Sequence, residues 1–154
     1  MTTFTKWFLL TAVTGTGLFF AETQGALSLI ISNDKSYLSL AIMSLFVGMS
    51  VYCGYLAFHA DTAKSLDDRV KLLKKSEIGW FTAEHFFSFS LLGTIIGLVL
   101  ATGGSLDGSK PVSEIVAGLK IGLNTAFYTT ICGIVFSLLL QVQLLILKLG
   151  LDKK

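Results

Sequence analysis

Hydroxyl and small side chains cluster inside two long apolar stretches, 86–102 and 121–147. The first stretch contains the segment GTIIG at 93–97, and the second contains TTICG at 129–133. A hydroxyl surrounded by hydrocarbon needs a hydrogen-bond partner, and small residues let another helix come close enough to supply one. The two stretches therefore predict helices that pack closely together or line a cavity within a membrane.

Helical spacing sorts these side chains onto shared faces, because residues four apart lie on one ridge of a helix. On the later stretch one ridge comprises Gly118, Gly122, Ala126 and Thr130, and the adjacent ridge comprises Thr125, Thr129, Gly133, Ser137 and Gln141. On the earlier stretch Ser90 and Thr94 adjoin a ridge made of Gly93, Gly97 and Ala101.

Two interpretations of these faces stay open. Small residues alone serve helix packing, and the candidates for that role are Gly93, Gly97, Gly118, Gly122, Ala126 and Gly133. Hydroxyl and amide groups suit a hydrated ion pathway, and its candidates are Thr94, Thr130, Thr129, Thr125, Asn124 and Ser90.

The sequence contains no set of residues typical of an enzyme or a metal site. We find no nucleophile–base arrangement and no glycine loop for phosphate, and the two cysteines lie in apolar runs without metal-ligand spacing. Glu22 is a candidate intramembrane acid, which either bonds a neighbouring helix near the interface or takes part in ion transfer. We therefore predict no enzyme, no cofactor and no bound metal.

Composition places these residues in an all-α membrane protein. The 154 residues are 53% hydrophobic and 14% charged, and the apolar residues fall in blocks longer than the roughly 18 needed for a spanning helix. We predict one membrane domain over 1–154 in the lipid bilayer, with helices at about 7–31, 37–60, 80–103 and 112–149. A net charge of +2 gives no indication of nucleic-acid binding.

The charged segment 61–78 separates the second and third predicted helices. Leu66, Val70 and Leu73 recur there at helical spacing, so this loop is predicted to be a helical extension with one apolar stripe. Glu84 and His85 adjoin the charged segment, and we interpret them as residues at the membrane interface.

Basic residues set the orientation by the positive-inside rule. With four helices and both termini on one side, nine cations share the terminal side and three lie opposite. The nine are Lys6, Lys64, Arg69, Lys71, Lys74, Lys75, Lys148, Lys153 and Lys154, and the three are Lys35, Lys110 and Lys120. Both termini are therefore predicted to be cytoplasmic.

The segments LLGTIIG at 91–97 and GLNTAFYTTICGIVFSLL at 122–139 resemble the MotA/TolQ/ExbB proton-channel superfamily, over about 70 residues from Phe86 onward. Thr94 with Gly97, and Ala126 with Thr130 and Gly133, stand at the positions of its two pore-helix motifs. The resemblance implies a homopentamer in the bacterial inner membrane, around a dimer of single-span partners of the ExbD/TolR/MotB type. It also implies that an aspartate of the partner titrates and that Thr94 and Thr130 face this aspartate.

The resemblance thus predicts a channel or stator subunit of an ion-driven rotary motor that powers an envelope process. ExbB-like members carry a glutamate where this chain has Thr125, so the transported ion is H⁺ or Na⁺. The alternatives are a tetraspan scaffold or assembly protein, in which the small ridges only pack, and a self-contained pore.

Overall fold

The computed structural model describes residues 2–103 and 111–152 and contains five α-helices in that part of the chain. They are α1 (Thr3–Thr23), α2 (Ala26–Asn33), α3 (Leu38–Thr62), α4 (Leu66–Gly103) and α5 (Val112–Asp152). Four of them, all except α2, are long and apolar enough to cross a membrane. The all-α class is confirmed, and these four helices make the chain a multi-pass membrane protein by length and composition.

The first predicted helix is two helices, so a continuous helix over 7–31 is wrong. The break lies at Gly25, whose φ of 75° is a left-handed conformation that glycine adopts without the steric penalty of a side chain. The carboxylate of Glu22 accepts hydrogen bonds from the backbone N (3.1 Å) and Oγ (2.6 Å) of Ser28 in α2. Glu22 therefore holds α1 and α2 together across the break.

The charged segment is mostly helical and forms the first three turns of α4. Ser65 Oγ accepts a hydrogen bond from the backbone N of Asp68 at 3.2 Å, which satisfies one of the free donors at this helix start. Asp67 and Asp68 lie in the first turn, where negative charge is favoured by the helix dipole. The prediction of a helical extension is therefore met, and the extension belongs to the same helix as the GTIIG segment.

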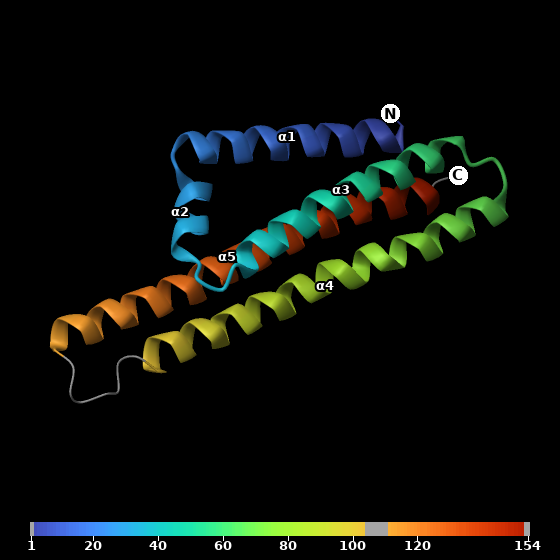
Figure 1. The fold of residues 1–154 in the computed structure, drawn as a ribbon. Helices are drawn as coiled ribbons and strands as arrows, with labels where there is room; N and C mark the ends of the chain where they lie inside the picture. Colours follow the sequence, from blue (N-terminus) through green and yellow to red (C-terminus); the bar gives the residue numbers. More distant parts are fainter. Residues whose placement is uncertain (1, 104–110, 153–154) are drawn as a thin grey trace.

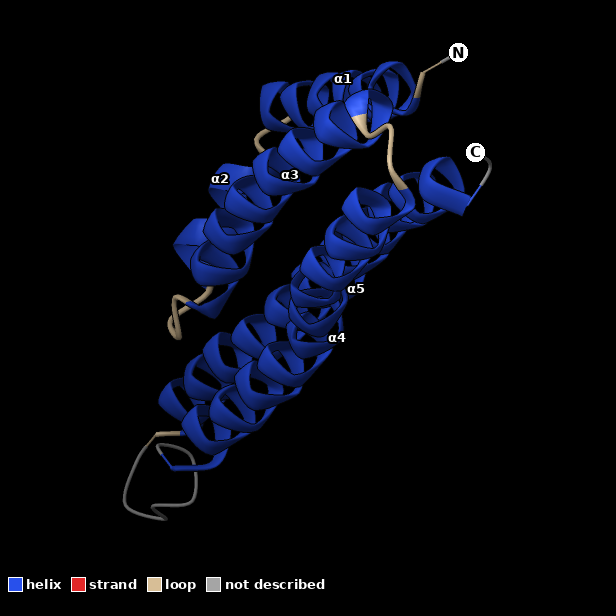
Figure 2. Ribbon diagram, turned by 90° about the vertical axis from the view of Figure 1, so that its right-hand side faces the viewer, coloured by secondary structure: helices blue, strands red, loops and turns tan. Residues whose placement is uncertain are grey.

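One end of the bundle gathers the N-terminal end of α1, the α3–α4 connection and the C-terminal end of α5 (Figure 1). The two helices α4 and α5 form a long antiparallel hairpin, and α5 contacts each of the other four helices. The helices α1, α2 and α3 lie on one side of this hairpin (Figure 2). Within residues 2–103 and 111–152, α4 contacts α3 and α5 but not α1 or α2.

Acidic side chains fix both ends of α3 to the rest of the bundle. Asp61, near its C-terminal end, accepts hydrogen bonds of 2.8 Å from the backbone N atoms of Thr3 and Phe4, so it caps α1. Asp34, which is 2% exposed, accepts a bond of 2.8 Å from the backbone N of Ser39 in the first turn of α3. These contacts stabilise two helix starts that otherwise have free backbone donors.

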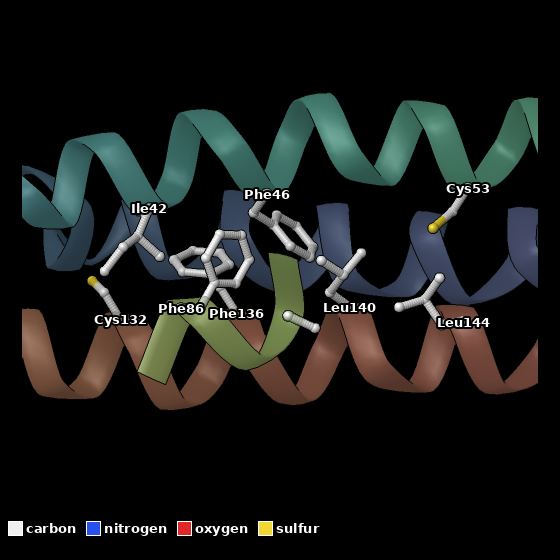
Figure 3. Close-up of a cluster of buried hydrophobic side chains, with 9 residues drawn as sticks. Ile42, Phe46, Cys53, Phe86, Cys132, Phe136, Leu140 and Leu144 are labelled. Atoms are coloured by element: carbon white, nitrogen blue, oxygen red, sulfur yellow. The ribbon is translucent and has the colours of Figure 1, made fainter. Parts of the chain in front are cut away.

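The core lies where α3 packs against the α4–α5 hairpin. Phe46 of α3 and Phe136 of α5 have ring centroids 4.9 Å apart, and Phe86 of α4 lies in the same cluster (Figure 3). Cys132 and Cys53 are buried members of this cluster and carry no disulfide. These contacts fix the axial position of α4 relative to α3, on which the location of the site depends.

The hairpin extends beyond α3 at the end opposite the termini. The α2–α3 turn contacts Thr125, which is 13 residues after the start of α5. At 1.5 Å per residue, the first turns of α5 therefore extend about 20 Å past this turn.

Candidate functional site

Glycine residues bring α4 and α5 into backbone contact along most of the hairpin. A Cβ atom at Gly97 would lie 2.5 Å from the carbonyl O of Gly122 and 2.6 Å from the backbone N of Ala126. A Cβ atom at Gly93 would lie 2.5 Å from Oγ1 of Thr129. The predicted packing residues thus lie in the interface between two helices of one chain.

The remaining predicted packing residues belong to the same hairpin. Gly133 packs against Ser90 and the carbonyl O of Phe86, and Ser90 is 2% exposed. Gly118 is half-buried in the first third of α5. The small ridges therefore allow α4 and α5 to approach closely within the chain.

Thr94 and Thr130 meet at the edge of this interface. Their Oγ1 atoms are 2.8 Å apart, and both residues are half-buried. Thr94 Oγ1 lies 3.1 Å from the carbonyl O of Ser90, and Thr130 Oγ1 lies 2.8 Å from that of Ala126. Each hydroxyl has one proton and two lone pairs, so the pair keeps acceptor lone pairs for a cation. Either hydroxyl can donate to an anion if it gives up its bond to a backbone carbonyl O.

Thr125 and Asn124 instead bind the α2–α3 turn. Thr125 is fully buried, and its Oγ1 donates to the carbonyl O of Asn33 and accepts from the backbone N of Lys35, both at 3.2 Å. Asn124 Nδ2 donates to Oδ1 of Asn33 at 3.3 Å. These two residues hold the turn against α5. Local sequence patterns do not predict this contact, because it joins residues about 90 apart.

Thr129 is fully buried and bonds within its own helix. Its Oγ1 lies 2.9 Å from the carbonyl O of Thr125 and 3.1 Å from that of Ala126. Its side chain also fills the space beside Gly93. Of the six predicted pathway residues, the structure therefore brings Thr94 and Thr130 together at an open edge and surrounds Thr125, Thr129 and Ser90 with protein.

A second polar group lies on the same side of the hairpin. Glu84 and Phe87 of α4 line a groove of about 500 Å³ with Ile134, Ser137, Leu138 and Gln141 of α5. Ser137 Oγ donates to the carbonyl O of Ala83 at 2.7 Å, and Gln141 Nε2 donates to Ser137 Oγ at 3.1 Å. Polar side chains from both helices therefore border one groove.

The interpretation of Glu84 as an interfacial residue stays a prediction. Its neighbours Ala83 and Phe86 belong to the cluster that contains Phe46 of α3. The charged turns of α4 lie beside the C-terminal half of α3, where Tyr52 Oη donates to the carbonyl O of Lys75. Glu84 is nine residues, or about 14 Å, further along α4 than Lys75.

Within the described residues no group of three or more His, Cys, Asp or Glu side chains is placed to hold a metal ion. No family model, curated protein or solved structure matches this chain.

Proposed function

We propose that this protein is the channel subunit of an ion-driven motor, and that it conducts H⁺ or Na⁺ together with a single-span partner that carries an aspartate. The observation that carries the proposal is the Thr94–Thr130 pair, whose Oγ1 atoms are 2.8 Å apart at the open edge of the α4–α5 interface. Both threonines come from the segments that resemble the MotA/TolQ/ExbB superfamily. The pair can donate to a carboxylate or bind a cation.

The proposed assembly is a pentamer in a bacterial inner membrane, with α4 and α5 turned toward the partner helices. The position of α1 and α3 on one side of the hairpin supports this arrangement, because the opposite side stays free for a partner (Figure 2). Cytoplasmic termini are part of the proposal. The α1 start, the α3–α4 connection and the α5 end share one end of the bundle, and they carry most of the lysine and arginine residues.

Replacing both threonines by valine tests the proposal. Cross-linking in native membranes identifies the single-span partner, and the purified complex is reconstituted in liposomes for measurement of H⁺ and Na⁺ flux. We expect Thr94→Val with Thr130→Val to lower the flux by about 10- to 150-fold, since hydrogen bonds to charged groups contribute about 1.5–3 kcal/mol. Thr94→Ser with Thr130→Ser keeps both hydroxyls and is the matched control.

The alternatives give different results in the same assay. A self-contained pore conducts when this chain is reconstituted alone, whereas the proposed channel requires its partner. A tetraspan scaffold gives no flux in either case and tolerates the serine and valine pairs equally. Full flux in the valine variant would refute the assigned role of Thr94 and Thr130.

A further inference from the structure

Glu84 is an acid at the start of the apolar part of α4. It is exposed and lies about 10 Å along the helix from Glu77, and no acid, lysine or arginine follows it up to Gly103. A charged group inside the hydrocarbon layer is costly, so such residues face protein or a hydrated path rather than lipid. A polar neighbour on α5 would therefore stabilise Glu84.

The groove beside Glu84 supplies polar atoms from α5. Gln141 uses its amide nitrogen to donate to Ser137 Oγ, which in turn donates to the carbonyl O of Ala83. This chain of bonds fixes the orientation of the Gln141 amide and leaves its Oε1 oxygen as an acceptor in the groove. A carboxylate and an amide oxygen are ligands suited to a small hard cation.

Glu84 and the Thr94–Thr130 pair share one side of the hairpin. On α4, Thr94, Phe87 and Glu84 follow at intervals of seven and three residues, and on α5, Thr130, Ile134 and Gln141 follow at four and seven, so each set lies on one helix face. Ten residues separate Thr94 from Glu84, which corresponds to about 15 Å along the helix toward the end that holds the termini.

We propose that Glu84 with Gln141 binds the transported cation, H⁺ or Na⁺, after it leaves the Thr94–Thr130 pair toward the end of the bundle that holds the termini. This inference depends on the proposed channel function for the direction of transport, whereas cation binding at Glu84 stands by itself. The other groove residues are uncharged, and the adjacent His85 points its Nδ1 at the carbonyl O of Phe81, 2.7 Å away. A cation in the groove would therefore interact chiefly with Glu84.

A hydrophobic carbodiimide tests the binding site without any partner. Dicyclohexylcarbodiimide partitions into lipid, where a protonated carboxyl group adds across one of its N=C bonds, and the modified peptide is found by mass spectrometry. In the full chain in liposomes we expect modification at Glu84 and none at Glu77, an exposed acid on the charged turns of α4. Protection by Na⁺ at constant pH identifies a sodium site, whereas protection only by raised pH identifies a proton site. Absence of modification at Glu84 overturns the proposal.

Flux through the reconstituted complex tests the role in transport. We expect Glu84→Gln to lower the flux by about a hundredfold or more, as for loss of a positioned proton-transfer group, and Glu84→Asp to restore part of it. Glu114→Gln, in the first turn of α5, is the control and retains full flux. Full flux in Glu84→Gln overturns the proposal and leaves the channel function intact.

Two further outcomes separate the site from the channel. Labelling of Glu84 with ion protection in a complex that conducts nothing refutes the channel function and supports the cation site. Loss of the oligomer in Glu84→Gln, with the monomer still folded, shows that Glu84 binds a neighbouring copy and overturns the proposal.

Discussion

The close backbone contact of α4 and α5 at Gly97 gives a prediction that links stability to the threonine pair. A Cβ atom at Gly97 would lie 2.5 Å from the carbonyl O of Gly122, whereas ordinary contacts begin at 3.4 Å. The obstructing atoms belong to the backbone, which cannot turn aside as a flexible side chain can. Gly97→Ala therefore requires the two helices to separate locally by about 0.9 Å, which follows from these two distances.

This separation affects the Thr94–Thr130 hydrogen bond, because Gly97 is one turn from Thr94. A movement of about 0.9 Å lengthens the 2.8 Å contact to about 3.7 Å, beyond hydrogen-bond range. Overpacking of a tight interface costs about 1–3 kcal/mol. We expect Gly97→Ala to lower the free energy of unfolding by this amount, less the roughly 0.8–1 kcal/mol that alanine gains in helix propensity, and to lower the ion flux of the assembled complex as well.

Reversible unfolding in mixed micelles of dodecylmaltoside and dodecyl sulfate, followed by circular dichroism, measures the free energy. Gly48→Ala on α3 is the matched control, because its added Cβ atom meets nothing within 4 Å. The control gains about 0.8–1 kcal/mol from higher helix propensity. If Gly97→Ala unfolds at the same dodecyl sulfate fraction as Gly48→Ala, the close backbone contact derived from the structure is wrong.

Three consecutive residues of α5 give the remaining predictions, measured by the same unfolding assay. Leu144 is fully buried, whereas Leu145 is 47% exposed. We expect Leu144→Ala to lower the free energy of unfolding by about 2–5 kcal/mol and Leu145→Ala by less than about 0.5 kcal/mol. Equal losses of stability would refute the orientation of this helix. Gln143 is 1% exposed, and within the described residues neither amide atom has a hydrogen-bond partner. Gln143→Leu should therefore stabilise the protein by about 1–3 kcal/mol, and a loss of stability would show that the amide is satisfied.

The four long helices follow from the sequence because hydropathy is a local property. Runs such as 121–147 are long, mostly apolar and free of charged residues, which only a membrane or a deeply buried helix accommodates. The break at Gly25 was missed although its signals were present. The segment from Glu22 to Gly25 is polar and ends in glycine, a common helix stop.

The partners of the site residues depend on the axial position of each helix relative to its neighbours. Hydropathy does not predict these relative positions. Helical spacing placed Thr94 and Thr130 on faces of small residues, but their contact depends on the pairing of Gly93 with Thr129 and Gly97 with Ala126. The level of Glu84 relative to α3 is not predictable for the same reason. The sequence contains its distance from the charged segment along the chain but not its neighbours on other helices.

The distribution of polar groups on the hairpin favours an assembly that covers one particular side. The α3 side of the hairpin is already covered, and there Thr125 and Asn124 bond to the α2–α3 turn. On the other side Thr94, Thr130, Glu84 and Gln141 would face lipid in an isolated chain, where their remaining donors and acceptors lack partners. A helix of another protein placed against that side would cover all four residues at once. In the proposed assembly, the single-span partner that carries the aspartate supplies this helix. Mutations on this side should therefore act on ion flux, whereas mutations on the α3 side should act on folding.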